Sequence, residues 1–83
     1  MSAGTTHERL KEIIIELLGV EPRLVTPETT FIEMGADSLD RVEMTMAVEL
    51  EFGISIADAD ADRVKTVGEA VTLIDQLVLR RVA

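Results

Sequence analysis

The stretch that decides the fold is GADSLDRVEMTMAVELEFG, residues 35–53. From Ser38 onward its apolar side chains recur at helical spacing, which predicts a helix over residues 38–52. Asp37 is expected as the N-cap, and Asp40 falls in the first turn, where the helix dipole favours negative charge. Gly53 fits the C-terminal stop.

This predicted helix has two apolar sides. At about 100° per residue, one stripe consists of Leu39, Val42, Met46 and Leu50. Roughly opposite lie Met44, Val48 and Phe52. One side can face the core of a bundle. The other is either a docking surface or the second buried side of a central helix, and the pattern favours neither.

Two further long helices are predicted, over residues 5–18 and 67–80. Each begins with a capping box, in which a hydroxyl residue is followed three positions later by glutamate. The pairs are Thr5 with Glu8 and Thr66 with Glu69. Gly19 fits the end of the first helix.

The connecting segments contain the turn-forming residues. Residues 20–37 carry Pro22 and Pro27 and predict a long loop, which in so small a domain tends to be functional. Residues 54–66 predict a loop with a short helical turn near 58–63, and no strand is predicted. The expected fold is all-α, a small helical bundle, with residues 1–4 as a flexible tail and 5–83 as a single domain.

Composition limits the chemistry that the chain can perform. Only 2% of its 83 residues are aromatic, so the core must be aliphatic. The absence of cysteine excludes disulfides, zinc–thiolate sites and a cysteine nucleophile. Neither a signal peptide nor a transmembrane span is predicted, and a cytoplasmic monomer is expected.

The net charge of −8 is concentrated in the middle of the chain. Residues 33–62 hold nine acids and one base, Arg41, whereas the remainder holds seven of each. Charge of one sign gathered in one region steers basic partners over long range. It argues against nucleic acid and anionic membranes as partners.

Ser38, at the start of the second predicted helix, allows three interpretations. A serine in this position most often caps the helix. A catalytic serine would need a base, and the only histidine is His7, near the N-terminus. The third interpretation is a hydroxyl that another enzyme modifies after docking on the nearby acids Asp37, Asp40 and Glu43.

The residues around Ser38 carry a family resemblance. Gly35-Ala36-Asp37-Ser38-Leu39-Asp40, followed by Val42-Glu43 and Met46-Ala47, closely resembles the acyl carrier protein family, in its discrete bacterial form. The similarity covers almost the whole chain. It includes Leu17-Leu18-Gly19-Val20, Phe31, Glu49-Leu50-Glu51-Phe52 and Thr66-Val67-Gly68-Glu69-Ala70.

The resemblance implies a four-helix bundle with a short third helix. It also implies that Ser38 receives 4′-phosphopantetheine from coenzyme A, which makes the protein a non-catalytic phosphoprotein that carries acyl groups as thioesters. The implied pathway is fatty acid or related lipid biosynthesis. Implied partners are a phosphopantetheinyl transferase, acyltransferases, ketoacyl synthases, reductases and dehydratases with basic docking patches.

The resemblance also assigns the two sides of the second helix. The implied docking surface comprises Asp37, Leu39, Asp40, Arg41, Val42, Glu43, Met46, Glu49 and Leu50. The implied acyl-chain pocket comprises Met44, Val48, Phe52, Ile56, Val64, Val71 and Ile74. Aliphatic and methionine side chains suit such a pocket, because they repack around variable guests.

Some positions, among them Arg41 and Leu50, depart from the common fatty-acid carriers that the chain resembles. Arg41 stands three residues after Ser38, where a small hydroxyl residue is usual, and Leu50 replaces a common acid. Both are expected to lie on the partner surface. The alternative function is therefore a specialised carrier for an unusual lipid or a polyketide.

An alternative of a different class is a calcium-binding protein. Asp58, Asp60, Asp62 and Glu69 fall at positions 1, 3, 5 and 12 of an EF-hand loop. Arg63 nevertheless occupies position 6, where that loop needs glycine, and its charge opposes a cation. An EF-hand is therefore disfavoured, and only weak surface binding of divalent ions by the three aspartates is expected.

The concentration of acids predicts a measurable effect of salt. Because like charges repel in the folded state, added salt or divalent cations should raise the melting temperature. Calorimetry over a series of NaCl and MgCl₂ concentrations measures this directly. A melting temperature that does not rise with ionic strength would argue against a repulsive acidic region.

Overall fold

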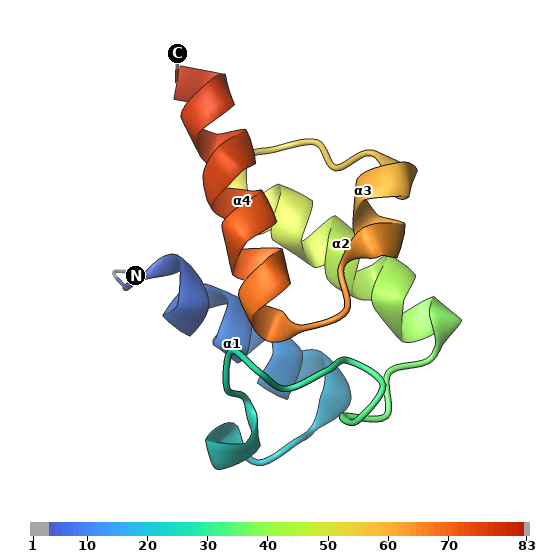
Figure 1. Ribbon diagram of the computed structural model, residues 1–83. Helices are drawn as coiled ribbons and strands as arrows, with labels where there is room; N and C mark the ends of the chain where they lie inside the picture. Colours follow the sequence, from blue (N-terminus) through green and yellow to red (C-terminus); the bar gives the residue numbers. More distant parts are fainter. Residues whose placement is uncertain (1–3, 83) are drawn as a thin grey trace.

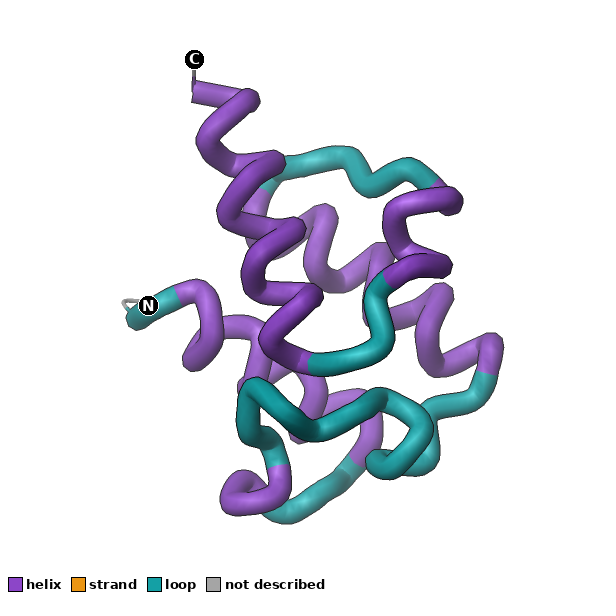
Figure 2. The backbone as a smooth tube through the Cα atoms, in the orientation of Figure 1, coloured by secondary structure: helices purple, strands orange, loops and turns teal. Residues whose placement is uncertain are grey.

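The computed structural model describes residues 4–82, and within them it shows an all-helical bundle (Figures 1 and 2). The long helices are α1 (Thr6–Leu18), α2 (Ser38–Phe52) and α4 (Val67–Val82). The short elements are the helix α3 (Asp58–Arg63) and a 3₁₀ turn (Pro22–Leu24) in the first loop. The predicted all-α fold with a short third helix is confirmed. Of the predicted tail, residues 1–3 lie outside the described residues.

Reciprocal hydrogen bonds fix the start of each long helix. In α1 the Glu8 amide donates to Thr5 Oγ1 and the Thr5 amide donates to Glu8 Oε1, at 3.1 and 2.9 Å. Thr66 and Glu69 form the same box at the start of α4. Both predicted capping boxes are therefore confirmed, and they define where the helices begin.

Aspartates rather than a serine close the start of α2. The Asp40 amide donates to Asp37 Oδ1 at 2.8 Å, and the Asp37 amide donates to Asp40 Oδ2 at 3.2 Å. The predicted N-cap is confirmed, and Asp40 forms the second half of a box that the sequence analysis did not anticipate. Gly53 ends α2 in the left-handed conformation that glycine adopts without strain (φ 66°).

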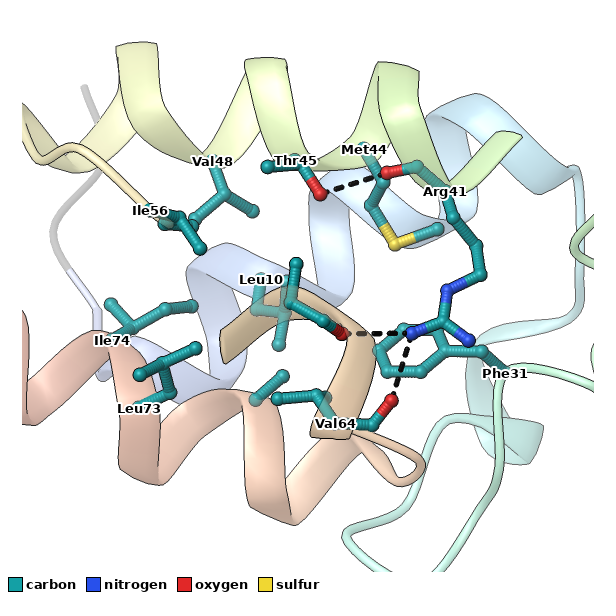
Figure 3. A pocket seen from close by; sticks show the side chains of 12 residues that line it. Leu10, Phe31, Arg41, Met44, Thr45, Val48, Ile56, Val64, Leu73 and Ile74 are labelled. Carbon is teal, nitrogen blue, oxygen red and sulfur yellow. Dashed lines mark hydrogen bonds between the residues drawn. The ribbon is translucent and has the colours of Figure 1, made fainter. Parts of the chain in front are cut away.

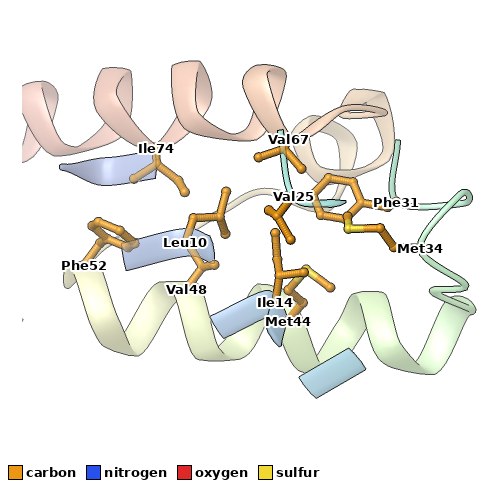
Figure 4. Packing of buried hydrophobic residues seen from close by; sticks show 10 residues of the cluster. All are labelled: Leu10, Ile14, Val25, Phe31, Met34, Met44, Val48, Phe52, Val67 and Ile74. Atoms are coloured by element: carbon orange, nitrogen blue, oxygen red, sulfur yellow. The ribbon is translucent and has the colours of Figure 1, made fainter. Parts of the chain in front are cut away.

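The core lies where α2 and α4 both pack on α1 (Figure 4). Leu10 and Ile14 of α1 are at its centre, with exposed fractions of 1% and 0%. Around them pack the other buried side chains, Val25, Phe31, Met34, Met44, Val48, Phe52, Val67 and Ile74. As composition predicted, the core is mainly aliphatic, and each of the two phenylalanines lies at its edge in Figure 4.

The long loop between α1 and α2 is fastened to the start of α4. The Phe31 amide donates to Lys65 O at 3.1 Å, and the Gly68 amide donates to Pro27 O at 2.9 Å. A side chain at position 68 would place its Cβ only 3.0 Å from that Pro27 oxygen. Glycine therefore allows this close approach, and any other residue would push the loop back by a few tenths of an ångström.

The two apolar sides of α2 differ fully in burial. Met44, Val48 and Phe52 are each at most 6% exposed. The opposite stripe of Leu39, Val42, Met46 and Leu50 is at least 57% exposed. Within the described residues α2 is thus covered on one side, and its second apolar side is open. No helix in residues 4–82 is long and apolar enough to cross a membrane.

This difference predicts opposite outcomes for two methionines in one helix. Met44→Ala should lower the free energy of unfolding by about 2–5 kcal/mol, because it leaves a cavity in the core. Met46→Ala, two positions along, should change it by no more than about 0.5 kcal/mol, because the side chain is already exposed. Urea unfolding followed by circular dichroism measures both. Equal losses for the two variants would contradict the assignment of the buried face.

Candidate functional site

Ser38 is the first residue of α2 and is exposed to solvent. Because Asp37 caps the helix, the serine hydroxyl is not required for that task. Within residues 4–82, no group forms a hydrogen bond with the Ser38 hydroxyl. The structure therefore presents a free hydroxyl at a junction between a loop and a helix.

The loop before Ser38 is ordered by Thr30 and Glu33. The Thr30 amide and hydroxyl both donate to Glu33 Oε1, at 2.8 and 3.0 Å, and the Glu33 amide donates to Thr30 Oγ1. These bonds favour the carboxylate and lower the pKa of Glu33, with the backbone bond as the largest cause. Phe31 and Met34 anchor the same turn in the core.

Acids surround Ser38, and within residues 4–82 no histidine lies near it. Asp37 and Glu43 are exposed and Asp40 is half-buried. His7 lies in the first turn of α1, and Figure 1 shows that turn on the opposite side of the molecule from the start of α2. His7 therefore cannot activate the Ser38 hydroxyl. The arrangement suits a serine that reacts only with help from another protein.

A mostly apolar cavity of about 60 Å³ lies between α2, α3 and α4, with Arg41 at one end of it (Figure 3). Its lining consists of Leu10, Phe31, Arg41, Met44, Thr45, Val48, Ile56, Ala61, Val64, Ala70, Leu73 and Ile74. The structure brings together five of the seven residues expected in a pocket. These are Met44, Val48, Ile56, Val64 and Ile74.

Comparison with protein families decides the identity. The family model described as a phosphopantetheine attachment site matches residues 8–74, most of the chain. The chain belongs to the phosphopantetheine attachment site family. Domains of this family bind a 4′-phosphopantetheine prosthetic group and act as non-catalytic carriers. As a member, this carrier interacts with a modifying transferase and with biosynthetic enzymes.

The site around Ser38 can accommodate that group. Its exposed hydroxyl offers one oxygen to a phosphodiester, and the positive end of the α2 dipole favours phosphate at this position. The nearby carboxylates of Asp37 and Asp40 are engaged with backbone amides, which disperses part of their charge. The residues present therefore fit the prosthetic group of the family.

Arg41 of this carrier does not lie on the partner surface predicted from the sequence. Its side chain is half-buried and lines the cavity. Its Nη2 donates to Val64 O at 2.8 Å and to Ala61 O at 3.1 Å. Hydropathy treats an arginine as solvent-facing, and these carbonyl acceptors come from a distant segment, so the sequence alone did not reveal them.

Glu49 also has an internal partner. Its Oε2 accepts a hydrogen bond from the Ile56 amide at 2.8 Å, which orders the loop after α2. Leu50, by contrast, is 85% exposed. The exposed part of the expected docking surface is therefore formed by Asp37, Leu39, Val42, Glu43, Met46 and Leu50.

Phe52 and Val71 do not line the cavity. Phe52 is buried at the far end of α2, with the Arg9 guanidinium 4.3 Å from its ring centre. Leu73, not Val71, faces the cavity from α4. The lining also includes five residues that the sequence did not predict, namely Leu10, Phe31, Thr45, Ala61 and Ala70. Their contribution depends on how the helices cross, which hydrophobic periodicity does not specify.

The geometry of residues 58–69 contradicts the EF-hand alternative. The segment that would have to wrap a cation is the helix α3 followed by the start of α4. Asp60 pairs with Arg63, and Glu69 accepts the amides of Lys65 and Thr66. Within the described residues, no cluster of three or more ligating side chains could hold a metal ion.

The Thr30–Glu33 turn predicts a local response to pH. A lowered folded-state pKa means that the carboxylate stabilises the turn above its ordinary pKa of 4.5, and that this contribution is lost as the pH falls through the folded-state value. The Thr30 amide proton should therefore titrate in NMR spectra with a midpoint below 4.5.

A matched variant isolates this effect. In Glu33→Gln, the acid titration of the Thr30 amide should disappear, whereas that of the Thr66 amide, which bonds to Glu69, should persist. A Thr30 midpoint at or above 4.5 in the wild type would show that Glu33 is not held as described.

Proposed function

We propose that Ser38 carries the 4′-phosphopantetheine arm and that the protein shuttles acyl groups as thioesters in fatty acid or related lipid biosynthesis. The observation that carries this proposal is the free, exposed hydroxyl at the start of α2 in a domain of the phosphopantetheine attachment site family. Ser55 is also exposed, but it lies in the loop after α2, away from a helix start.

Attachment of the arm is a phosphoryl transfer from coenzyme A. The Ser38 Oγ attacks the phosphorus next to the pantetheine unit. A serine–phosphorus bond forms, the pyrophosphate bond breaks, and adenosine 3′,5′-bisphosphate leaves. The serine proton must pass to a base on the transferase, because the only histidine of this chain lies across the molecule.

The arm supplies the reactive sulfur. The chain contains no cysteine, so a thioester on this protein requires a thiol from the prosthetic group. The protein itself contributes a scaffold that presents the arm and an apolar cavity for the first part of its cargo. Catalysis of each acyl transformation belongs to the partner enzymes.

The open side of α2 is the proposed docking surface for those enzymes. Its apolar side chains Leu39, Val42 and Met46 are 57–65% exposed, and Asp37 and Glu43 lie beside them. Rim charges of this kind chiefly raise association rates with basic partners. A small apolar contact combined with electrostatic steering suits a carrier that must leave each partner quickly.

A specialised carrier, for an unusual lipid or a polyketide, is the second candidate. The observation that favours it is Leu50, which extends the exposed apolar stripe at the end of α2 and is 85% exposed. A leucine there offers a partner a hydrophobic contact in place of an acid. Partners with a matching apolar recess would select this carrier from more acidic ones.

Intact mass spectrometry tests the attachment. Incubation with coenzyme A and a broad-specificity phosphopantetheinyl transferase should add one phosphopantetheine to the wild type and none to Ser38→Ala, because only this hydroxyl accepts the arm. Ser55→Ala is the matched control and should be modified like the wild type. A wild type left unmodified by several such transferases, or a Ser38→Ala variant that still gains the mass, would refute the proposal.

A further inference from the structure

We infer that Arg41 determines which acyl chains this carrier accepts, because its guanidinium ties α3 to α2 across one side of the cavity and opposes the widening that a long chain requires. The inference rests on the proposed carrier function and extends it to the choice of cargo. It assigns Arg41 a role in the interior, in place of the partner surface.

The tie is a pair of charge-assisted hydrogen bonds. Arg41 Nη2 donates to the carbonyl oxygens of Ala61 and Val64, at the C-terminal end of α3. The Ala61 oxygen also accepts the Val64 amide at 3.3 Å. Carbonyls at a helix C-terminus carry the negative end of the helix dipole, so a cation there is stabilising. The guanidinium also lies 5.9 Å from the centre of the Phe31 ring, which limits its movement on the other side.

Little else holds α3 in place. The helix has six residues, none of them buried, and its N-cap residue Ala57 offers no side-chain hydrogen bond. Asp60 and Arg63 pair with each other within the helix. Among the described residues, Arg41 is the only side chain of another helix that forms a hydrogen bond with the α3 segment. Loss of the tie should therefore loosen α3 before it affects the core.

Arg41 also stands next to the route of the cargo. Residues three apart lie on neighbouring positions of a helix surface, so Arg41 is one turn from Ser38. Figure 3 shows its side chain running from α2 toward the carbonyl of Val64, beside Phe31 and along the edge of the cavity. A chain attached through Ser38 reaches Arg41 before it reaches Ile56 and Ile74 at the opposite end.

The size of the cavity makes the tie relevant to chain length. Its volume of about 60 Å³ corresponds to only a few water molecules, at about 10–15 Å³ for each. A short acyl chain fits with small shifts of the lining side chains. A long chain needs α3 to move away from α2, which breaks the Arg41 bonds. The tie therefore favours short chains over long ones.

The first experiment uses the unmodified protein and is independent of the carrier function. Amide hydrogen exchange of the α3 segment is compared among the wild type, Arg41→Met, Arg41→Lys and Arg63→Met. Arg41→Met keeps the apolar stem but removes the donors, and exchange in α3 should accelerate several-fold. Arg41→Lys should be intermediate, because it retains the charge. Arg63→Met removes an exposed cation whose pair with Asp60 lies within α3 and does not connect that helix to α2, so exchange should change far less than in Arg41→Met.

The second experiment measures the choice of cargo. The same proteins are loaded with butyryl, octanoyl and dodecanoyl pantetheine by a broad-specificity transferase. Methyl NMR of Ile56, Leu73 and Ile74 then reports entry of the chain. Butyryl should perturb these methyls in every variant. Octanoyl and dodecanoyl should do so weakly in the wild type and in Arg63→Met, and several-fold more strongly in Arg41→Met.

The outcomes separate this inference from the proposed function. If Arg41→Met matches Arg63→Met in exchange or in its dependence on chain length, the role of Arg41 in selection is overturned. If the wild type cannot be loaded at all, the carrier proposal fails, and the role of Arg41 in selection fails with it. Faster exchange of α3 in Arg41→Met would then show only that Arg41 holds this helix in place. Should Arg41→Met not fold, as judged by circular dichroism, Arg41→Lys provides the same comparison with a smaller expected change.

Discussion

The fold depends on the packing of α2 and α4 on one helix, α1, through the fully buried Leu10 and Ile14. Both helices pack more extensively on α1 than on each other, and a cavity remains between them. Leu10 forms part of the floor of that space, and α3 lies across it. The cavity is thus a consequence of how three long helices share one core.

Two aspartates cap the start of α2, which explains why the hydroxyl of its serine is available for modification. A helix start needs acceptors for its free amides, and serine is a good candidate for that task. Here Asp37 and Asp40 satisfy two of these amides between them. The hydroxyl of Ser38 is left free, and the turn formed by Thr30 and Glu33 holds the loop that leads to it.

Local signals predicted the elements well, because caps, glycine stops and periodicity act over a few residues. The predicted helices over 38–52 and 58–63 match the observed bounds, and α4 extends two residues beyond the predicted 67–80. The pattern could not decide whether both apolar sides of α2 are buried, since that depends on the placement of other helices. The position of Arg41 was missed for the same reason: its acceptors, Ala61 and Val64, lie 20 and 23 residues away in the chain.

The lack of buried residues in α3 has a consequence for the history of such a protein. Substitutions in a core are constrained, because most of them lower a stability that is small to begin with. The residues of α3 escape that constraint, yet one of them, Ala61, borders the cavity that we propose receives the cargo. Substitutions in this segment can therefore accumulate while the rest of the bundle stays the same. A carrier can thereby change the acyl chain that it accepts with little loss of folding stability.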